Sequence, residues 1–436
     1  MITQQEHQAR RQRLFDQMEP NTVAVFPAAP EYPLTLDHAV AFSQDNDFLY
    51  LTGFPETQAV AVLVKDDEGC RYVLFNRIKD KEAEIWVGDR VGQEGACSHY
   101  LADEAHPIAE LTEKLPHYLK DKSALYYTLG RYEGFDQTIR QALNDVRTRV
   151  RGGVKVPVQI INVESMVFEM RLVKSDAELA ILRKAAEISA AAHVRVMKAC
   201  QAGKNEYELA AELVYEFLRH GCQGEAYGSI VGGGKNACVL HYEKNDSVLN
   251  DGEMLLVDAG ARYHHYCADI TRTFPINGKF SSEQRDLYQV VLNAQLKAIE
   301  AIKAGQPWNV MSDAAALAIT EGLVDLKILK GCPKTLFEQQ AYAPYYMHRI
   351  GHWLGMDVHD VGYYKVDGQW RNLQAGMMTT IEPGLYFRQG DDSVHKRWWN
   401  MGVRIEDDIL ITDKGYDVFS HGAPKTVEEI EAIMQG

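Results

Sequence analysis

The stretch EMLLVDAGARYHHYCADITRTF, residues 253–274, places acidic side chains inside apolar, strand-like segments. Residues 378–412 do the same, with TTIEPGLYF followed by GVRIEDDILIT. The carboxylates in these two regions are Asp258, Asp269, Glu382 and Glu406. An isolated carboxylate loses its hydration on burial, so four of them on buried strands require a cationic partner. The sequence therefore predicts a metal centre between the two regions.

A histidine-rich stretch, HRIGHWLGMDVH at residues 348–359, lies between the two acidic regions. Four oxygen donors and one imidazole match a pair of hard or borderline divalent ions such as Mn²⁺, with Co²⁺, Fe²⁺ or Zn²⁺ as alternatives. Two neighbouring ions need bridging ligands, which carboxylates supply and imidazole does not. Taken singly, each of these residues is commonly structural. Their order within a repeated architecture is what favours the metal.

The residues around Glu406 carry further expectations. Side chains along a strand alternate between its two faces, so Arg404 shares a face with Glu406. Arg404 is therefore expected to lie beside Glu406 and to orient it. The following acids, Asp407 and Asp408, are expected to be solvated or to cap a turn.

Composition excludes several classes of protein. With 61 acidic against 46 basic residues the net charge is −15, which argues against nucleic acid or an anionic membrane as a partner. Seven cysteines without a C-x-x-C pair are expected to be thiols in a reducing compartment. The amino terminus has no apolar signal region, and no run reaches the roughly 18 apolar residues of a spanning helix. We expect a cytoplasmic protein.

The chain is too long for one ordinary core, and we expect a boundary near residue 170. Residues 1–170 are predicted to form an α/β domain with a helix over 108–119 and strands at 22–26, 59–64 and 72–75. The stretch FSQDNDFLYLTGF, residues 42–54, is too polar for a core strand and too aromatic for a plain loop. It is either a recognition surface or a structural loop. Trp86, in EIWVGDR, is a second exposed-looking aromatic with the same ambiguity.

Residues 171–436 repeat one order of elements. Helices begin at the capping boxes Ser175 with Glu178, Asn205 with Glu208, and Ser281 with Gln284. Two helices precede strands at 227–231, 255–259 and 268–274, and two more precede strands at 378–387 and 403–412. We expect two related halves that close one mixed sheet with helices on its outer face, a pseudo-symmetric α+β domain.

Two other motifs are set aside. Gly232-Gly233-Gly234-Lys235 lacks both the following Ser or Thr and the first glycine of a phosphate-binding loop. His348 and His352 have the spacing of a zincin helix, but Arg349 stands where Glu is needed and nearby glycines disfavour a helix.

The motifs VDAG, ADITRTF, GHWLGMDVHD, IEPG and RIEDD resemble those of the metal-dependent pita-bread peptidases. The whole chain most resembles the bacterial Xaa-Pro aminopeptidase (aminopeptidase P) family, strongly from about residue 164 and more loosely before it, where DFLYLTGF matches best. The resemblance implies a pita-bread catalytic domain over residues 171–436. It also implies two divalent ions per chain, most simply Mn²⁺, on the ligands Asp258, Asp269, His352, Glu382 and Glu406.

The resemblance further implies roles around the metals for His241, His348 and His359, with Tyr386 and Arg404 as supporting residues. An amino-terminal loop and a tryptophan like Trp86 are implied to reach a neighbouring subunit's site. Asp45, in the same domain, is expected to support substrate binding. That domain would serve substrate access and assembly into a homodimer or homotetramer. The sequence departs from the family at Ser43, where Arg is usual, and at residues 349–351, where Ser or Gly is common; both departures bear on substrate specificity.

The implied reaction is hydrolysis of the bond between an amino-terminal residue and a following proline. The expected nucleophile is a hydroxide bridging two ions, with Glu382 as general base and His359 or His348 stabilising the oxyanion. The substrates would be peptides with proline at the second position. The alternative within the class is a prolidase, which cuts only Xaa-Pro dipeptides. A binding module, or a metal-free hydrolase of small amidines, is disfavoured because such relatives lack several of the ligands.

Overall fold

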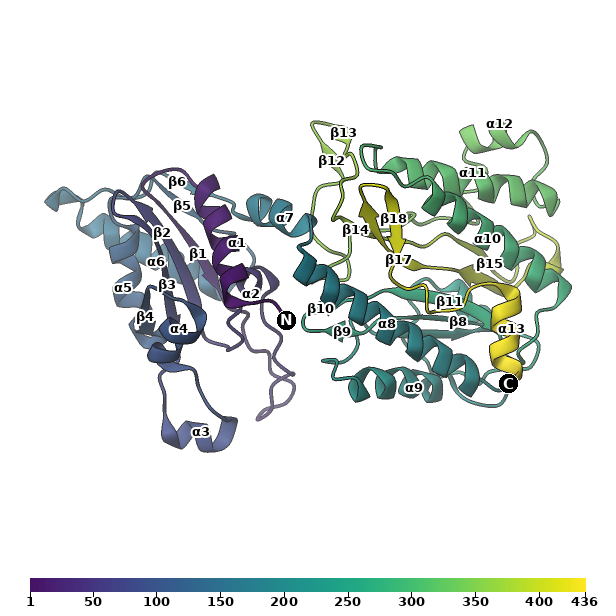
Figure 1. Ribbon diagram of the computed structural model, residues 1–436, viewed down its shortest axis with the longest axis horizontal. Helices are drawn as coiled ribbons and strands as arrows, with labels where there is room; N and C mark the ends of the chain where they lie inside the picture. The colour runs from purple at the N-terminus through teal and green to yellow at the C-terminus, as the bar shows by residue number, and fades with distance from the viewer. The chain divides into compact units, whose positions relative to one another are not determined.

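The computed structural model describes residues 1–436, which form two compact units, residues 2–170 and residue 1 with residues 171–436 (Figure 1). Each unit contains its own apolar core. All seven cysteines are free thiols, as expected. No helix combines the length and the apolar character needed to cross a bilayer.

The amino-terminal unit is built on a six-stranded sheet of order β4-β3-β2-β1-β5-β6. Its strands are β1 (Thr22–Pro27), β2 (Val60–Asp66), β3 (Gly69–Asn76), β4 (Glu104–Pro107), β5 (Ala124–Tyr126) and β6 (Gln159–Ile161). The first three pair antiparallel, and the other three join them in parallel. Alternate apolar residues of the central strands pack against α5 (Leu111–Leu119) and α6 (Glu133–Thr148). The predicted α/β domain is confirmed.

The centre of the stretch FSQDNDFLYLTGF differs from both alternatives, an exposed recognition surface and a structural loop. Phe42 and Ser43 are exposed, but a buried helix follows them. Residues 46–52 form helix α2 (Asn46–Thr52), and all seven are buried. Asp45 caps the helix by accepting a hydrogen bond from the Phe48 N–H at 2.9 Å, and Gly53 ends it in the left-handed conformation, at φ 65°. Seven residues are too few for helical periodicity to distinguish this segment from a loop. Trp86, on α3 (Lys81–Val87), is 86% exposed.

The second unit repeats its elements as expected. Helices α8 (Asp176–Ala199) and α9 (Glu206–Arg219) precede one set of strands, and α10 (Ser282–Glu300) and α11 (Asn309–Asp325) precede another. The first set is β7 (Ile230–Gly233), β8 (Met254–Ala259) and β11 (Ile270–Pro275). The second set is β14 (Met378–Ile381), β15 (Gly384–Phe387), β16 (Met401–Arg404), β17 (Asp407–Thr412) and β18 (Gly415–Val418). All three predicted capping boxes form.

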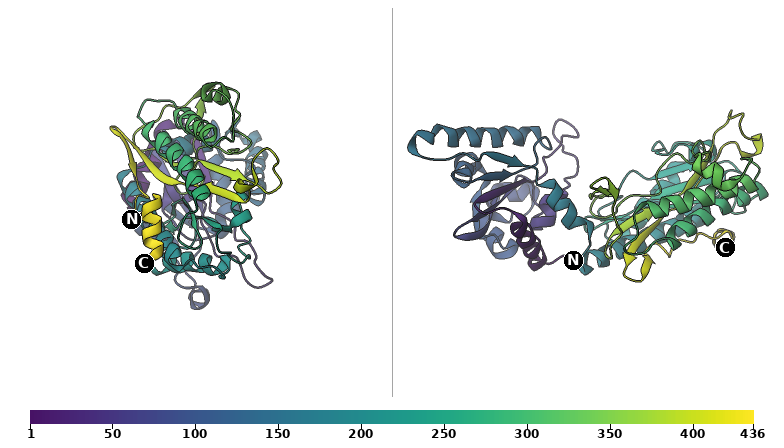
Figure 2. Two further views of the ribbon diagram at one scale, coloured as in Figure 1. Left: turned by 90° about the vertical axis from the view of Figure 1, so that its right-hand side faces the viewer. Right: turned by 90° about the horizontal axis from the view of Figure 1, so that it is seen from above.

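The expectation of one mixed sheet is wrong. The strands form separate sheets, β11-β8-β7, β14-β17-β18 and β15-β16, and every pair in them is antiparallel. Short connections within each half allow antiparallel pairing, whereas parallel strands need a long crossover. Helix α8 packs against β8 and β11, and α10 packs against β14, β15 and β16. Figure 2 shows the helices α10 and α11 on one side of these strands.

The two halves meet where β11 runs beside residues 404–407. The Thr273 hydroxyl donates to the Arg404 carbonyl oxygen at 2.9 Å, and the Glu406 N–H donates to the Thr271 carbonyl oxygen at 3.0 Å. The neighbouring Arg272, fully buried, donates to the Glu406 carbonyl oxygen at 2.6 Å and to Asp407 at 2.7 Å. These bonds place the backbone of Glu406 against the first half.

The expectation that Asp407 and Asp408 are solvated is wrong. Both are fully buried. Asp407 pairs with Arg272 and with Lys425, whose Nζ lies 2.6 Å away. Burial alone would raise the pKa of Asp407, but these two cations lower it well below its usual range. Asp408 accepts a hydrogen bond from the backbone N–H of Asp269 at 3.2 Å.

Removal of the Asp407 carboxylate is expected to destabilise the second unit strongly. Asp407→Ala leaves Arg272 buried without its ionic partner, a change that costs about 3–5 kcal/mol of unfolding free energy. Asp417→Ala breaks an exposed pair with Arg183 and is the control, expected to cost less than about 1 kcal/mol. Urea unfolding followed by tryptophan fluorescence measures both, because every tryptophan except Trp86 lies in this unit. Equal losses in the two variants would contradict the prediction.

Candidate metal centre

The five predicted metal ligands come from separate elements and line one cavity of about 590 Å³. Asp258 lies on β8 and Asp269 directly precedes β11. Glu382 follows β14, and Glu406 lies between β16 and β17. His352 lies in the irregular segment between α12 (Pro333–Glu338) and β12 (Lys365–Val366), so the dismissal of a zincin helix is correct.

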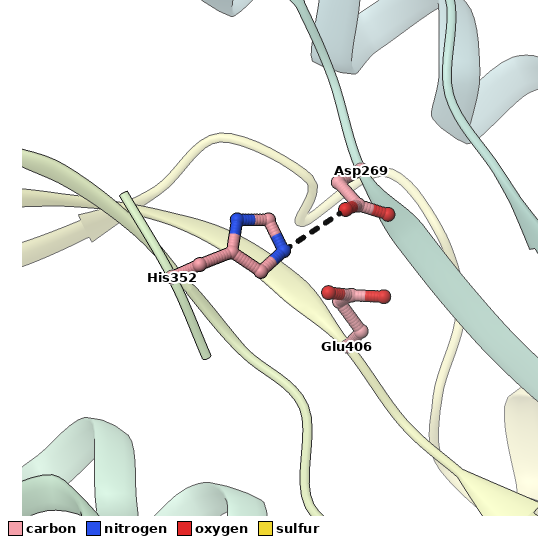
Figure 3. A group of neighbouring side chains, drawn as sticks. All are labelled: Asp269, His352 and Glu406. Atoms are coloured by element: carbon pink, nitrogen blue, oxygen red, sulfur yellow. Dashed lines mark ion pairs between the residues drawn. The ribbon is translucent and has the colours of Figure 1, made fainter. Parts of the chain in front are cut away.

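Three of these side chains form the centre of the group. Ligand atoms of Asp269, His352 and Glu406 all lie within 4.8 Å of one another, and the three side chains point toward a common space (Figure 3). The His352 Nε2 atom is 3.3 Å from Asp269 Oδ2 and 3.7 Å from Glu382 Oε1. The arrangement brings oxygen donors from both halves of the unit to one imidazole nitrogen.

The tautomer of His352 fits a metal at this position. Its Nδ1 atom is 3.0 Å from the Trp353 carbonyl oxygen, which can only accept, so Nδ1 carries the proton. The Nε2 atom then presents a lone pair toward the carboxylates of Asp269 and Glu382. Lone pair and carboxylate repel each other unless a cation lies between them, and a backbone carbonyl on the far nitrogen is the usual support of a ligating histidine.

The carboxylates show the same shortage of positive charge. Burial, and then the neighbouring Glu406, raise the pKa of Glu382 to about 8. Burial and a second acid likewise raise the pKa values of Asp269 and Glu406 well above their usual range. Asp258 differs: burial raises its pKa, but Arg404 and the hydrogen bond from Tyr227 together lower it below its usual value. Oxygen-rich donors that resist ionisation without a cation fit a hard or borderline divalent ion.

Arg404 contacts a different carboxylate from the one expected. Its guanidinium donates to Asp258 Oδ2 at 2.5 Å and to the Tyr386 hydroxyl at 3.0 Å. It reaches Glu406 only through Thr271, whose hydroxyl accepts from Arg404 at 3.2 Å and donates to Glu406 at 2.7 Å. Arg404 can therefore orient Glu406 only indirectly, because its side chain extends across β11 to the neighbouring strand β8.

Tyr227 is a site residue that the sequence analysis missed. Its hydroxyl lies between Asp258 and Asp269, 2.5 Å from Asp258 Oδ1 and in hydrogen-bonding contact with Asp269 Oδ1. A strand is predicted over residues 227–231, but β7 begins only at Ile230, so Tyr227 precedes it. A tyrosine before a strand carries no signal that separates it from an ordinary core residue, so only the fold reveals this contact.

The predicted histidines His241, His348 and His359 line the same cavity. The ring of His359 lies 4.1 Å from that of His352, and burial followed by the charge of His352 lowers its pKa to about 4. His348 lies 2.9 Å from the Tyr386 hydroxyl, and burial followed by Arg404 lowers its pKa to about 4. Both imidazoles are therefore neutral near pH 7.

Two predicted residues belong to the amino-terminal unit. Asp45 is bound within that unit by Arg131, whose Nε lies 3.0 Å away, and by the Tyr132 hydroxyl at 2.8 Å. Trp86 is exposed on α3. Their part in substrate binding stays a prediction.

Comparison with known proteins identifies the family. The protein-family model described as "Metallopeptidase family M24" matches residues 180–413, more than half of the chain. The chain belongs to metallopeptidase family M24. A second model, "Aminopeptidase P, N-terminal domain", matches residues 7–126. The predicted family, the pita-bread fold class and the prediction of a metallo-exopeptidase are confirmed.

Individual M24 proteins align along the whole chain. The Xaa-Pro aminopeptidase of Escherichia coli (strain K12) is 42% identical over 434 residues, which cover 99% of this chain and 98% of that protein. The structure of Pseudomonas aeruginosa aminopeptidase PepP superposes with a TM-score of 0.98 at 46% identity, covering 100% of this chain and 98% of that one. The structure of zinc-substituted E. coli aminopeptidase P in complex with product superposes with a TM-score of 0.97 at 42% identity. It also covers 100% of this chain and 98% of that one.

Stabilisation by Mn²⁺ is expected to be larger at about pH 8 than at about pH 6. The raised carboxyl pKa values mean that the metal-free folded state holds more protons than the unfolded state. Its stability therefore falls as the pH rises from the ordinary carboxyl range toward the pKa of Glu382, about 8. A bound cation displaces those protons, so its stabilising effect grows over the same range. Thermal unfolding with and without Mn²⁺ at both pH values tests this, and an equal gain at both would contradict it.

Tyr227→Phe is expected to weaken Mn²⁺ binding about 10- to 100-fold, because removing a group that orients metal ligands has effects of this size. Titration calorimetry on metal-free protein measures the affinity. Tyr242→Phe is the matched control, since its buried hydroxyl donates to Glu206 at 2.8 Å and does not contact the five ligands. Unchanged affinity in Tyr227→Phe would show that the hydroxyl does not orient Asp258 and Asp269.

Proposed function

We propose that this chain is an aminopeptidase that removes an amino-terminal residue from peptides with proline at the second position. The observation that supports the proposal most directly is the convergence of four carboxylates, the bare Nε2 of His352 and three further histidines on one cavity. The M24 relatives of highest similarity reported above are named Xaa-Pro aminopeptidase or aminopeptidase P. We infer the specificity for proline from the names of those relatives.

We propose that Asp258, Asp269, His352, Glu382 and Glu406 hold two divalent ions. An oxygen-rich donor set with one imidazole favours Mn²⁺, with Co²⁺, Zn²⁺ and Fe²⁺ as alternatives. When bound, such ions provide Lewis acidity and lower the pKa of coordinated water toward neutrality. Tyr227 and Arg404 orient Asp258, and Thr271 orients Glu406.

Glu382 is the proposed proton carrier. A general base works best when its pKa is near the working pH, and burial with the neighbouring Glu406 raises the pKa of Glu382 to about 8 without metal. Cations held by the neighbouring ligands would lower this value. Glu382 accepts the proton of the attacking water and transfers it to the departing proline nitrogen. That nitrogen carries no hydrogen in the peptide, so it must gain one to leave.

The hydrogen bonds of the two candidate histidines favour His359 as the oxyanion stabiliser. His348 Nδ1 lies 2.9 Å from the Arg349 carbonyl oxygen and therefore carries the proton, so Nε2 accepts from the Tyr386 hydroxyl. No N–H of His348 is left for the substrate. His359 makes no hydrogen bond within the chain, so a ring N–H is available to a developing oxyanion. We assign His348 to the positioning of Tyr386.

Glu382→Gln is expected to lower the rate of release of the first residue from an Xaa-Pro-Yaa tripeptide with Mn²⁺ by about 10²- to 10⁴-fold, the usual contribution of a general base. Metal content measured by mass spectrometry separates loss of the base from loss of metal. Glu187→Gln, exposed on α8, is the control. A wild-type protein that cleaves Xaa-Pro but rejects Xaa-Pro-Yaa-Zaa would be a prolidase. Full activity of Glu382→Gln would contradict the proposed role.

The remaining predictions concern the assembly and the cell. A homodimer or homotetramer, a role of the amino-terminal domain in substrate access, and a cytoplasmic location stay predictions. Gel filtration with light scattering measures the first directly.

A further inference from the structure

Arg349 is a cation of the cavity wall that the proposed reaction does not use. It lines the cavity with an exposed side chain, and its guanidinium makes no ion pair or hydrogen bond within the chain. The other arginine of the cavity, Arg404, is buried and bound to Asp258.

The backbone on both sides of Arg349 is held in place. The Arg349 carbonyl oxygen accepts from His348 Nδ1 at 2.9 Å, and the carbonyl oxygen of the fully buried Ile350 accepts from the Glu382 N–H at 2.8 Å. At Gly351 an added Cβ would lie 2.0 Å from the Thr380 carbonyl oxygen, so the chain passes there in close contact with β14. The side chain of Arg349 therefore projects from a fixed backbone. In the chain it lies between His348, which positions Tyr386, and the predicted ligand His352.

The electrostatics of Tyr364 locate the guanidinium further. Tyr364 lines the cavity, and its hydroxyl accepts from the Trp353 N–H at 2.8 Å. Burial raises the pKa of Tyr364 to about 12, while the hydrogen bond from Trp353 and the charge of Arg349 act in the opposite direction. The positive charge of Arg349 therefore acts on the part of the cavity wall that Tyr364 forms. A different part of the lining carries Glu243, an exposed carboxylate that also lines a groove along α9 and would repel an anion.

We propose that Arg349 binds the carboxylate at the carboxyl end of a tripeptide substrate and so makes the enzyme select short peptides over longer ones. The inference rests on the proposed function, which places the first residue of the substrate at the predicted metal ligands, and Arg349 lines the same cavity. An extended tripeptide spans roughly 10 Å, within reach of one cavity of this size. Guanidinium and carboxylate form paired hydrogen bonds, which a lysine or an amide does not reproduce.

The test compares Ala-Pro-Leu with its carboxyl-terminal amide, Ala-Pro-Leu-NH2, in the full-length protein loaded with Mn²⁺. We expect wild-type protein to prefer the free acid by about 2- to 5-fold in kcat/KM, the range for an exposed ion pair. Arg349→Gln should lose this preference while keeping its rate on the amide. Lys334→Gln, which removes an exposed charge outside the cavity, should keep the wild-type preference and so controls for net charge.

Three outcomes would overturn the inference: equal kcat/KM for acid and amide in wild-type protein, an equal loss on both substrates in Arg349→Gln, or the same change in Lys334→Gln. If neither peptide is cleaved, the proposed function fails. The carboxylate subsite is then tested separately, by measuring the binding of peptides without cleavage. Calorimetry with Pro-Leu and Pro-Leu-NH2 should then show tighter binding of the acid to wild-type protein and equal binding of both to Arg349→Gln. Equal binding of the two to wild-type protein would reject the subsite.

Discussion

The mutual repulsion of four acids in one cavity is the constraint on which the rest of the second unit depends. Asp258, Asp269, Glu382 and Glu406 converge there, and Arg404 is the one buried cation that lines the same space. One arginine neutralises Asp258 but leaves the other three with raised pKa values. Both the donor chemistry and the raised pKa values fit a site that is stabilised by a divalent cation.

The junction of the two halves keeps these acids in place. Strand β11 uses its alternating faces for two purposes. Thr271 and Thr273 bind the residues around the metal site, while Arg272 on the other face binds Asp407 and the carbonyl oxygen of Glu406. One strand of the first half thus fixes both the side chain and the backbone of a ligand in the second. The pseudo-symmetry therefore matters for function, because the centre exists only where both halves meet.

Backbone carbonyls assign different chemistry to histidines that look alike in the sequence. The Trp353 carbonyl oxygen fixes the proton of His352 on Nδ1 and leaves Nε2 for a metal. The Arg349 carbonyl oxygen does the same for His348, whose Nε2 then faces a tyrosine hydroxyl instead of a carboxylate. His359 has no such partner, which is why we propose it as the oxyanion stabiliser. The same segment carries Arg349, so the proposed metal binding, oxyanion stabilisation and choice of substrate length all involve one irregular stretch of about a dozen residues.

The sequence by itself determined the helices of the second unit, its internal repeat, and the five predicted ligands and three histidines that converge on the cavity. Helix caps, hydrophobic periodicity and acids in apolar strands are local signals, and each has a direct physical cost or benefit. Only the tertiary structure decided the partners. Asp407 is buried rather than solvated because Arg272, 135 residues away, neutralises it. Arg404 binds Asp258 rather than Glu406, Tyr227 bridges two acids, and residues 46–52 are a buried helix, all because distant segments supply the contacts. A charged or polar side chain is stable in the interior only with its partner, and no local pattern names that partner.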